Sequence, residues 1–277
     1  MKTFKKIFDF YINSSIHVAQ AVAALVKLTL LKLDITTVQG DIFVGLSFMA
    51  TVVGYNFVKY VKVANLYHSR LTRSMKVIQA FTAICLVVLL YLVFQLTWTA
   101  ILYAIPLLVL TIIYAVPVFP NNKNLRSIAG IKIFIIGLVW TGITVIIPVI
   151  YSEKEINFDV CIEILQRFIF VVVLMLPFEI RDLQYDAREL GTIPQRVGIT
   201  RTKVFGSILL FIFLLCTPFK NDLSSLEIIV SIVITIICLL FLWGTEKKQS
   251  EYFCSFWVES IPILWLGIWI FLQHLIC

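Results

Sequence analysis

This sequence contains few charged residues. Only 14% of its 277 residues are Asp, Glu, Lys or Arg, whereas 60% are hydrophobic and the mean hydropathy is +0.98. About a quarter of the residues in soluble domains are charged, so the composition excludes a soluble globular protein. Alternating strands of about ten residues are also missing, which excludes a membrane β-barrel. An α-helical membrane bundle remains, because a backbone in lipid must satisfy its own hydrogen bonds.

Clusters of metal-binding residues and interdomain linkers are missing as well. The six cysteines stand singly without a C-x-x-C pair, and the three histidines are too dispersed to form a metal site by spacing. We therefore expect the cysteines to be small core residues. No Gly/Ser-rich or low-complexity segment divides the chain. The sequence predicts a single transmembrane helical domain over residues 1–277.

Long apolar runs are what the sequence does contain. Nine of them approach the ~20 residues that cross a hydrocarbon core about 30 Å thick. They cover residues 14–33, 42–60, 77–95, 98–117, 128–150, 160–180, 204–219, 226–243 and 253–275. The fold class predicted from them is an all-α integral membrane bundle of nine transmembrane helices.

The basic residues are distributed unevenly between the two sides of this predicted bundle. Eighteen of the 23 Lys and Arg residues fall at the N-terminus and in the segments on its side of the membrane. The positive-inside rule then predicts a cytoplasmic N-terminus and an external C-terminus, in the plasma (inner) membrane if the source is a bacterium. The net charge of +7 is explained by topology and requires no nucleic-acid partner.

Several polar residues lie inside the predicted spans, where charge is costly and usually faces the bundle interior. His17, Gln20 and Lys27 share one helical face of the first span. They indicate either interhelical hydrogen bonding or the lining of an internal cavity. Glu163 and Arg167 are four residues apart, which favours an internal ion pair. Glu259 in the last span has no such explanation.

The stretch "FEIRDLQYDARELGTIP" at residues 178–194 holds six charged side chains between Glu179 and Glu189. Asp182 and Asp186 are four residues apart, so both carboxylates project from one face if the helix continues through them. Mg²⁺ typically takes one or two protein carboxylates and completes its shell with water and phosphate oxygens. The alternative is a solvated loop in which the acids pair with Arg181 and Arg188.

The residues that follow add context to this pair of acids. "ARELGTIPQRVGI" after Asp186 resembles the second signature of the UbiA-type membrane prenyltransferases. The stretch after the fourth predicted span is also similar to that family, with Tyr114, Pro117, Lys123 and Arg126 at the matching positions. The resemblance implies nine helices and two aspartate-rich motifs, which face each other across a cavity and hold Mg²⁺ bound to a prenyl diphosphate. It gives Asp182 and Asp186 the catalytic and metal-binding roles.

The first motif of that family, N-x-x-x-D-x-x-x-D, is only partly present. Asn56 matches, but Tyr60 and Ala64 occupy the aspartate positions, and Lys59 lies beside them. The resemblance then implies one Mg²⁺ ion in place of two, with the Lys59 ammonium as a point charge for phosphate. The residues expected to bind the diphosphate are Asn56, Lys59, Arg73, Tyr114, Lys123, Arg126 and Arg181.

Three hypotheses follow from these observations. The first is an intramembrane transferase that moves a prenyl group from a diphosphate to an unknown apolar or aromatic acceptor; Glu179, Tyr185 and Glu189 are candidates for its general base by proximity alone. The second is an inactive descendant that binds an isoprenoid or anionic lipid, or that partners an active enzyme. The third is a small-molecule transporter, suggested by the polar residues inside the spans and opposed by the ninth helix and the lack of an inverted repeat.

Overall fold

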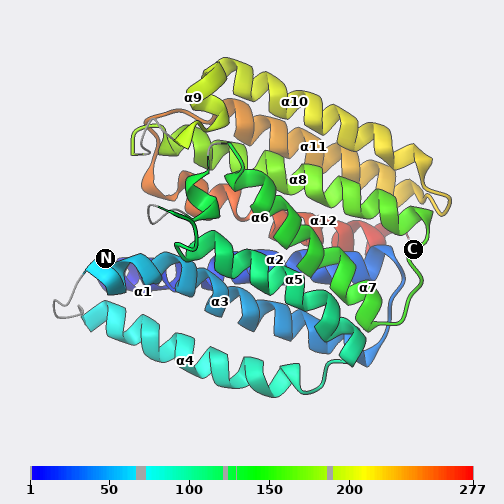
Figure 1. The fold of residues 1–277 in the computed structure, drawn as a ribbon. Helices are drawn as coiled ribbons and strands as arrows, with labels where there is room; N and C mark the ends of the chain where they lie inside the picture. The colour runs from blue at the N-terminus through cyan, green and yellow to red at the C-terminus, as the bar shows by residue number, and fades with distance from the viewer. Residues whose placement is uncertain (1, 67–72, 121–123, 129, 186–189, 277) are drawn as a thin grey trace.

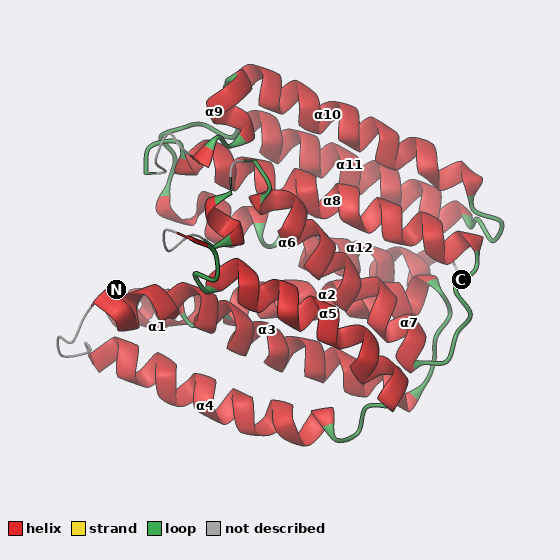
Figure 2. Ribbon diagram, in the orientation of Figure 1, coloured by secondary structure: helices red, strands yellow, loops and turns green. Residues whose placement is uncertain are grey.

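The computed structural model describes residues 2–66, 73–120, 124–128, 130–185 and 190–276. Within these ranges the chain forms helices and loops and no strand (Figure 2). The helices are α1 Lys2–Asn13, α2 Ile16–Lys32, α3 Val38–Leu66, α4 Arg73–Val93, α5 Trp98–Ala115, α6 Lys132–Thr141, α7 Ile147–Tyr151, α8 Phe158–Asp182, α9 Ile193–Val197, α10 Ile199–Cys216, α11 Ser225–Gly244 and α12 Ile261–Ile276.

Eight helical segments of the described chain are long and apolar enough to cross a membrane, and a ninth is obtained when α1 and α2 are counted as one bent span. The protein is therefore an integral, multi-pass membrane protein, as the sequence predicted. The bend between α1 and α2 is 55°. Ser15 at the bend has a left-handed backbone, with φ of +63°. The sequence placed a straight span at 14–33, and the bend was not predicted.

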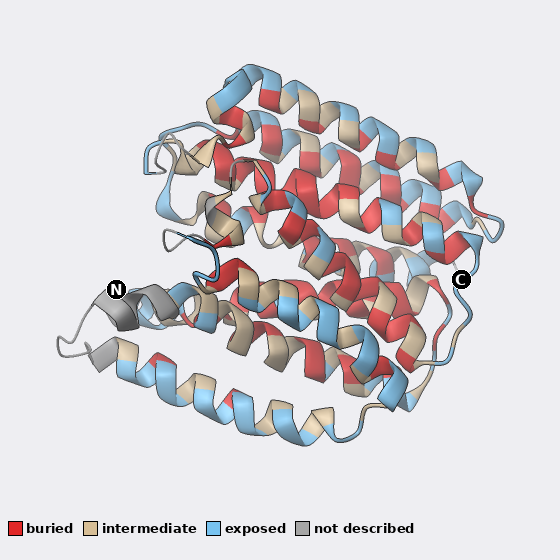
Figure 3. Cartoon of the chain, viewed as in Figure 1, coloured by how far each residue is buried: buried red, intermediate tan, exposed pale blue. Residues whose placement is uncertain are grey.

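α8 is the central helix of the bundle. It packs against α6, α10 and α11, while α2 packs against α3 and α12 (Figure 1). Buried residues make up 72% of the most apolar window of α8 and only 11% of that of α4. Figure 3 shows the contrast: α8 is largely buried, whereas α4 at the edge of the bundle is mostly exposed. The exposed apolar face of α4 suits contact with lipid.

Two spans contain a π-helical segment, in which one extra residue enters a turn. Residues Gly142–Ile146 join α6 to α7, and residues Phe253–Val258 precede α12. Such insertions rotate the side chains that follow and are frequent at functional sites. The second segment ends at Val258 and is followed by Glu259, whose backbone N–H donates to the Cys254 carbonyl at 3.2 Å.

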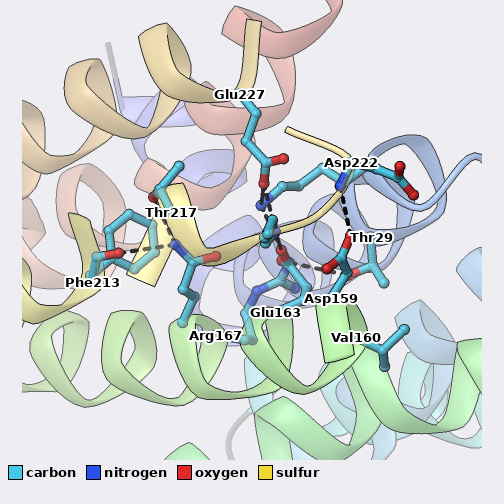
Figure 4. Close-up of polar contacts among 12 residues, drawn as sticks. Thr29, Asp159, Val160, Glu163, Arg167, Phe213, Thr217, Asp222 and Glu227 are labelled. Atoms are coloured by element: carbon cyan, nitrogen blue, oxygen red, sulfur yellow. Dashed lines mark hydrogen bonds and ion pairs between the residues drawn. The ribbon is translucent and has the colours of Figure 1, made fainter. Parts of the chain in front are cut away.

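A cluster of buried charges joins four segments at the end of the bundle away from the N-terminus (Figure 4). The Glu163 carboxylate contacts Lys32 at 2.6 Å, Lys220 at 2.8 Å and Arg167 at 2.9 Å. Glu227 contacts Lys32 at 2.8 Å and Lys220 at 2.6 Å. Each of the five side chains is at most 5% exposed. The ion pair predicted between Glu163 and Arg167 is confirmed, and three further charges complete it.

Hydrogen bonds around this cluster fix the loop that carries Lys220. The Asp159 carboxylate accepts hydrogen bonds from the backbone N–H groups of Asn221 and Asp222 at 2.9 and 3.0 Å. Burial alone would lower the pKa of the Lys220 ammonium, but the attraction of Glu163 and Glu227 outweighs it and raises the pKa above the usual value. Lys220 is therefore held in its charged form, and the cluster joins α2, α8 and α11 at this end.

Candidate functional site

The candidate site lies at the opposite end of α8, on the side of the bundle where the N-terminus lies (Figure 1). α8 ends at Asp182, and the Tyr185 backbone N–H donates to the Asp182 carbonyl at 2.9 Å in the turn that follows. A helix continued through Asp186, which would place both carboxylates on one face, is therefore not formed, because the chain turns after Asp182. Asp186 itself lies outside the described residues, so its pairing with Asp182 stays a prediction.

Asp182 is surrounded by cations. Its Oδ1 atom lies 2.8 Å from the Nε and Nη2 atoms of Arg181, and its Oδ2 atom lies 3.7 Å from Lys132 Nζ. Lys132 also contacts Glu179 at 3.1 Å. The Arg181 guanidinium stacks over the Phe178 ring at 5.2 Å. The pairing with Arg181 that the loop alternative predicted is thus present.

Asn56 on α3 holds the bend between α1 and α2. Its Nδ2 group donates to the Ser14 carbonyl at 3.0 Å and to the Thr82 hydroxyl at 2.8 Å, while its Oδ1 accepts from the Ser15 hydroxyl at 2.8 Å. The side chain is buried. Both amide hydrogens are used by the protein in this conformation, so a role of Asn56 toward a diphosphate stays a prediction and would require these contacts to change.

Lys59 and Tyr60 reach the same bend from one turn further along α3. Lys59 Nζ donates to the Asn13 carbonyl at 3.1 Å, and the Tyr60 hydroxyl donates to the same oxygen at 3.1 Å. The Lys59 ammonium also lies 5.7 Å from the centre of the Tyr60 ring. Lys59 is exposed. Tyr60, at the first aspartate position of the family motif, thus binds a backbone carbonyl where the family would bind metal.

Glu259 on the last span is a site residue that the sequence did not assign. Its carboxylate interacts electrostatically with Lys59 on α3 and with Arg181 on α8. The Cys254 thiol in the same segment accepts a hydrogen bond from the Gln249 side-chain amide at 2.9 Å. No ion pair within 4 Å joins Glu259 to either cation among the described residues, so the attractions to Lys59 and Arg181 act over a longer range. A carboxylate inside a span was the available signal, but its partners are far apart in sequence and could not be read from it.

His17 fixes the position of this last span. Its Nδ1 lies 2.7 Å from the Tyr11 hydroxyl, and its Nε2 lies 2.9 Å from the Phe256 carbonyl and 3.2 Å from the Ser260 hydroxyl. These are the contacts of interhelical hydrogen bonding, one of the two interpretations of the polar face of the first span. Lys27 forms a surface ion pair with Asp41 at 2.7 Å.

The remaining predicted residues are distributed as follows. Tyr114 is buried at the end of α5. Arg126 lines a small cavity together with Lys132 and Glu179, so it stands near the Asp182 cluster. Tyr185 is 77% exposed and faces away from the interior. Lys123, Asp186, Arg188 and Glu189, and the side chain of Arg73, lie outside the described residues.

The donor chemistry at this end suits a magnesium ion only in part. The described residues contain no group of three or more His, Cys, Asp or Glu side chains that could hold a metal. Asp182 supplies hard carboxylate oxygens, which Mg²⁺ prefers, and Mg²⁺ commonly takes only one or two carboxylates from a protein. The described side chains therefore suit an ion held jointly by Asp182 and a phosphate ligand, and they do not suit an ion held by the protein alone.

The sequence matches assign neither a family nor an activity to this chain. No family model matches the chain. A human protein described as an adhesion G protein-coupled receptor is 30% identical over 86 residues, which is 30% of this chain and 19% of that protein. The chain thus spans about a fifth of the length of this curated match, and no activity follows from it.

Two solved structures match nearly the whole chain. A UbiA homologue from Aeropyrum pernix covers 95% of this chain and 98% of its own, with a TM-score of 0.62 and 13% identity. A digeranylgeranylglyceryl phosphate synthase covers 98% and 97%, with a TM-score of 0.57 and 13% identity. The class defined by the fold is a multi-pass helical membrane protein. Its particular fold is that of the UbiA-type membrane prenyltransferases.

Proposed function

We propose that this protein binds a prenyl diphosphate at the N-terminal end of the bundle and transfers the prenyl group to an apolar or aromatic acceptor. The observation that carries the proposal is the convergence of two distant segments. Lys59, from the segment that resembles the first family motif, and Arg181, from the second, share Glu259 as an electrostatic neighbour. The ends of α3 and α8 that carry them lie at the same end of the bundle (Figure 1), which supports a diphosphate bound between them.

The side chains have distinct roles in this proposal. Lys59 and Arg181 bind the diphosphate oxygens, Lys59 as a point charge and Arg181 as a planar donor. Arg126 adds positive charge near Asp182. Asp182, with Asp186, holds one Mg²⁺ ion, which when bound neutralises charge on the diphosphate. Neutralisation at this position favours breakage of the carbon–oxygen bond, because negative charge develops on the leaving pyrophosphate.

The prenyl chain lies in the apolar interior or against lipid in this proposal. The described bundle offers many exposed apolar side chains along its spans, as at Leu90, Leu102 and Phe211. The diphosphate stays at the rim while the chain remains away from water. An acceptor that approaches from the bilayer then meets the allylic carbon without crossing a polar barrier.

A second candidate function is a non-catalytic isoprenoid-binding protein, and one observation favours it. Tyr60 replaces the first aspartate of the family motif, and its hydroxyl is bound to the Asn13 carbonyl. The other aspartate position is occupied by Ala64. A site that lacks these carboxylates can still bind a diphosphate through Lys59 and Arg181 while it fails to ionise it.

One experiment separates the two functions. The purified chain is incubated with prenyl diphosphates of increasing length, with and without Mg²⁺, and both thermal stabilisation and pyrophosphate release are measured. A transferase shows both when an acceptor is present. A binding protein shows stabilisation without release, whereas the absence of stabilisation by every chain length contradicts both functions.

A further inference from the structure

α1 is too polar to serve as the first half of a membrane span. Its 12 residues include Lys5, Lys6 and Asp9, and charged side chains in the hydrocarbon core are costly. α2 does not need this helix to cross the membrane, because its 17 residues rise about 26 Å, close to the thickness of the core. The 55° bend at Ser15 therefore falls where a span made of α2 alone ends.

The side chains of α1 divide into an apolar and a polar face. At about 100° per residue, the apolar face is formed by Phe4, Ile7, Phe8 and Tyr11. The opposite, polar face is formed by Lys5, Lys6, Asp9 and Asn13. A helix divided in this way lies in the plane of a membrane interface, with its apolar face toward the acyl chains and its cations among the headgroups.

The protein covers only part of the apolar face of α1. The Phe8 ring packs edge-on against Tyr252 and Phe256, with ring centroids 5.0 and 5.1 Å apart. One turn earlier, Phe4 and Ile7 are 75% and 64% exposed. Two large apolar side chains are therefore open to lipid at the end of the bundle where the N-terminus lies (Figure 1).

The position of α1 is fixed by contacts with α3 and the last span. The Asp9 carboxylate accepts a hydrogen bond from the Tyr252 hydroxyl at 2.5 Å. The Asn13 carbonyl accepts hydrogen bonds from Lys59 and Tyr60, both at 3.1 Å. A ligand that binds the outer face of α1 therefore also stabilises the junction of α3 with the last span.

We propose that α1 is an interfacial helix that binds the anionic phospholipid surface on its own side of the membrane. Phe4 and Ile7 enter the boundary of the acyl chains, and Lys5 and Lys6, which are both exposed, bind headgroup phosphates. Charge identifies the lipid, because two ammonium groups beside exposed apolar side chains complement acyl chains that carry a net negative headgroup. The inference is independent of the proposed function.

The first experiment locates α1 in the bilayer. Single cysteines from Phe4→Cys, Lys5→Cys, Lys6→Cys and Ile7→Cys, each in the full chain without native cysteines, are labelled with an environment-sensitive fluorophore. The proteins are placed in vesicles of phosphatidylcholine and phosphatidylglycerol that contain brominated lipid. We expect quenching and a blue shift at positions 4 and 7, and less of both at positions 5 and 6. Equal quenching at all four positions, or none at any, overturns the interfacial position.

The second experiment tests the charge of the lipid. The full chain in detergent is titrated with phosphatidylglycerol or phosphatidylcholine while thermal unfolding is followed, because a ligand of the folded chain raises the unfolding temperature. Phosphatidylglycerol should stabilise the wild type more strongly. In Lys5→Gln/Lys6→Gln, the concentration that gives half of this stabilisation should rise on the order of tenfold, because two charges near the headgroups are lost.

Lys247→Gln/Lys248→Gln is the matched control. This pair is also exposed, and it lies in the loop before the last span, at the same end of the bundle (Figure 1). The control removes the same charge without a change in α1, so the titration should match that of the wild type. Equal stabilisation of the wild type by the two lipids, or an equal loss in the two double variants, overturns the selection of anionic lipid by α1.

Discussion

Asp182 meets two cations before any ligand is present. Arg181 contacts it at 2.8 Å and Lys132 at 3.7 Å. For a metal-bound diphosphate to use this carboxylate, the cations must move to the phosphate oxygens while the metal takes their place. The same three side chains would then serve the empty site as an ion-paired cluster and the occupied site as ligands.

Replacement of Asp182 by Asn tests the metal role of this carboxylate. We expect turnover of a prenyl diphosphate to be lost and the dependence of diphosphate binding on Mg²⁺ to weaken, since a neutral amide is a poorer ligand for a hard cation. Both are measured on the purified protein. Asp34→Asn is the control, because Asp34 is exposed in a loop after α2 and its φ of +50° is tolerated by Asn. An unchanged rate in Asp182→Asn would falsify the assigned role.

Asn56 can be tested for a structural role as opposed to a ligand role. Its three hydrogen bonds hold Ser14, Ser15 and Thr82. Replacement by Ala removes the hydrogen-bond partner of the Ser14 carbonyl and of the Ser15 and Thr82 hydroxyls. We expect the free energy of unfolding to fall by about 1–3 kcal/mol. Thermal unfolding in detergent measures it. A variant of wild-type stability that no longer binds diphosphate would show instead that Asn56 contacts the ligand.

The helices show how far sequence alone could go. Every predicted span falls largely on helical residues, because a run of apolar residues of bilayer length has one stable conformation in lipid. The bend at Ser15 and the π-helical segment before Glu259 were not predicted. Both depend on tertiary partners, Asn56 for the bend and His17 for the last span, and these are far away in sequence.

The buried charge cluster shows the same limit. The Glu163–Arg167 pair was readable because both residues lie on one helix at a spacing of four. Lys32, Lys220 and Glu227 come from other segments. Each lies near the end of a span, where membrane topology alone would explain a charged residue. The candidate site divides in the same way. Asp182 was indicated by a local motif, whereas the electrostatic attraction of Glu259 to Lys59 and Arg181 arises only in the folded bundle.

The cluster predicts a large effect of one neutral substitution. Glu163→Gln leaves Lys32, Arg167 and Lys220 without their shared carboxylate in a buried environment. We expect a loss of about 3–5 kcal/mol, as for other buried ion pairs broken at one partner. Thermal unfolding in detergent measures it, with the exposed Glu155→Gln as control. Equal unfolding temperatures of the two variants would show that the cluster contributes little to stability.

At the scale of the whole molecule, the contacts of the polar intramembrane residues argue against transport. His17 is bound to Tyr11 and Phe256, and Glu163 and Arg167 belong to the buried cluster. We expect no accumulation of small solutes in proteoliposomes that contain the wild-type chain. Solute accumulation that is lost in His17→Ala would contradict this expectation and restore the transporter hypothesis.

The orientation of the bundle decides which compartment supplies the diphosphate. The termini lie at opposite ends of the bundle, and the candidate site shares its end with the N-terminus (Figure 1). The excess of Lys and Arg on that side predicts that it is cytoplasmic. A cysteine at position 248, in the loop before the last span, should then react with a membrane-impermeant maleimide only after cells are permeabilised, in a background without native cysteines. A cysteine at position 155, in the loop before α8, should react in intact cells. The reverse pattern would place the site outside, away from the cytoplasmic pool of diphosphates that the proposed function requires.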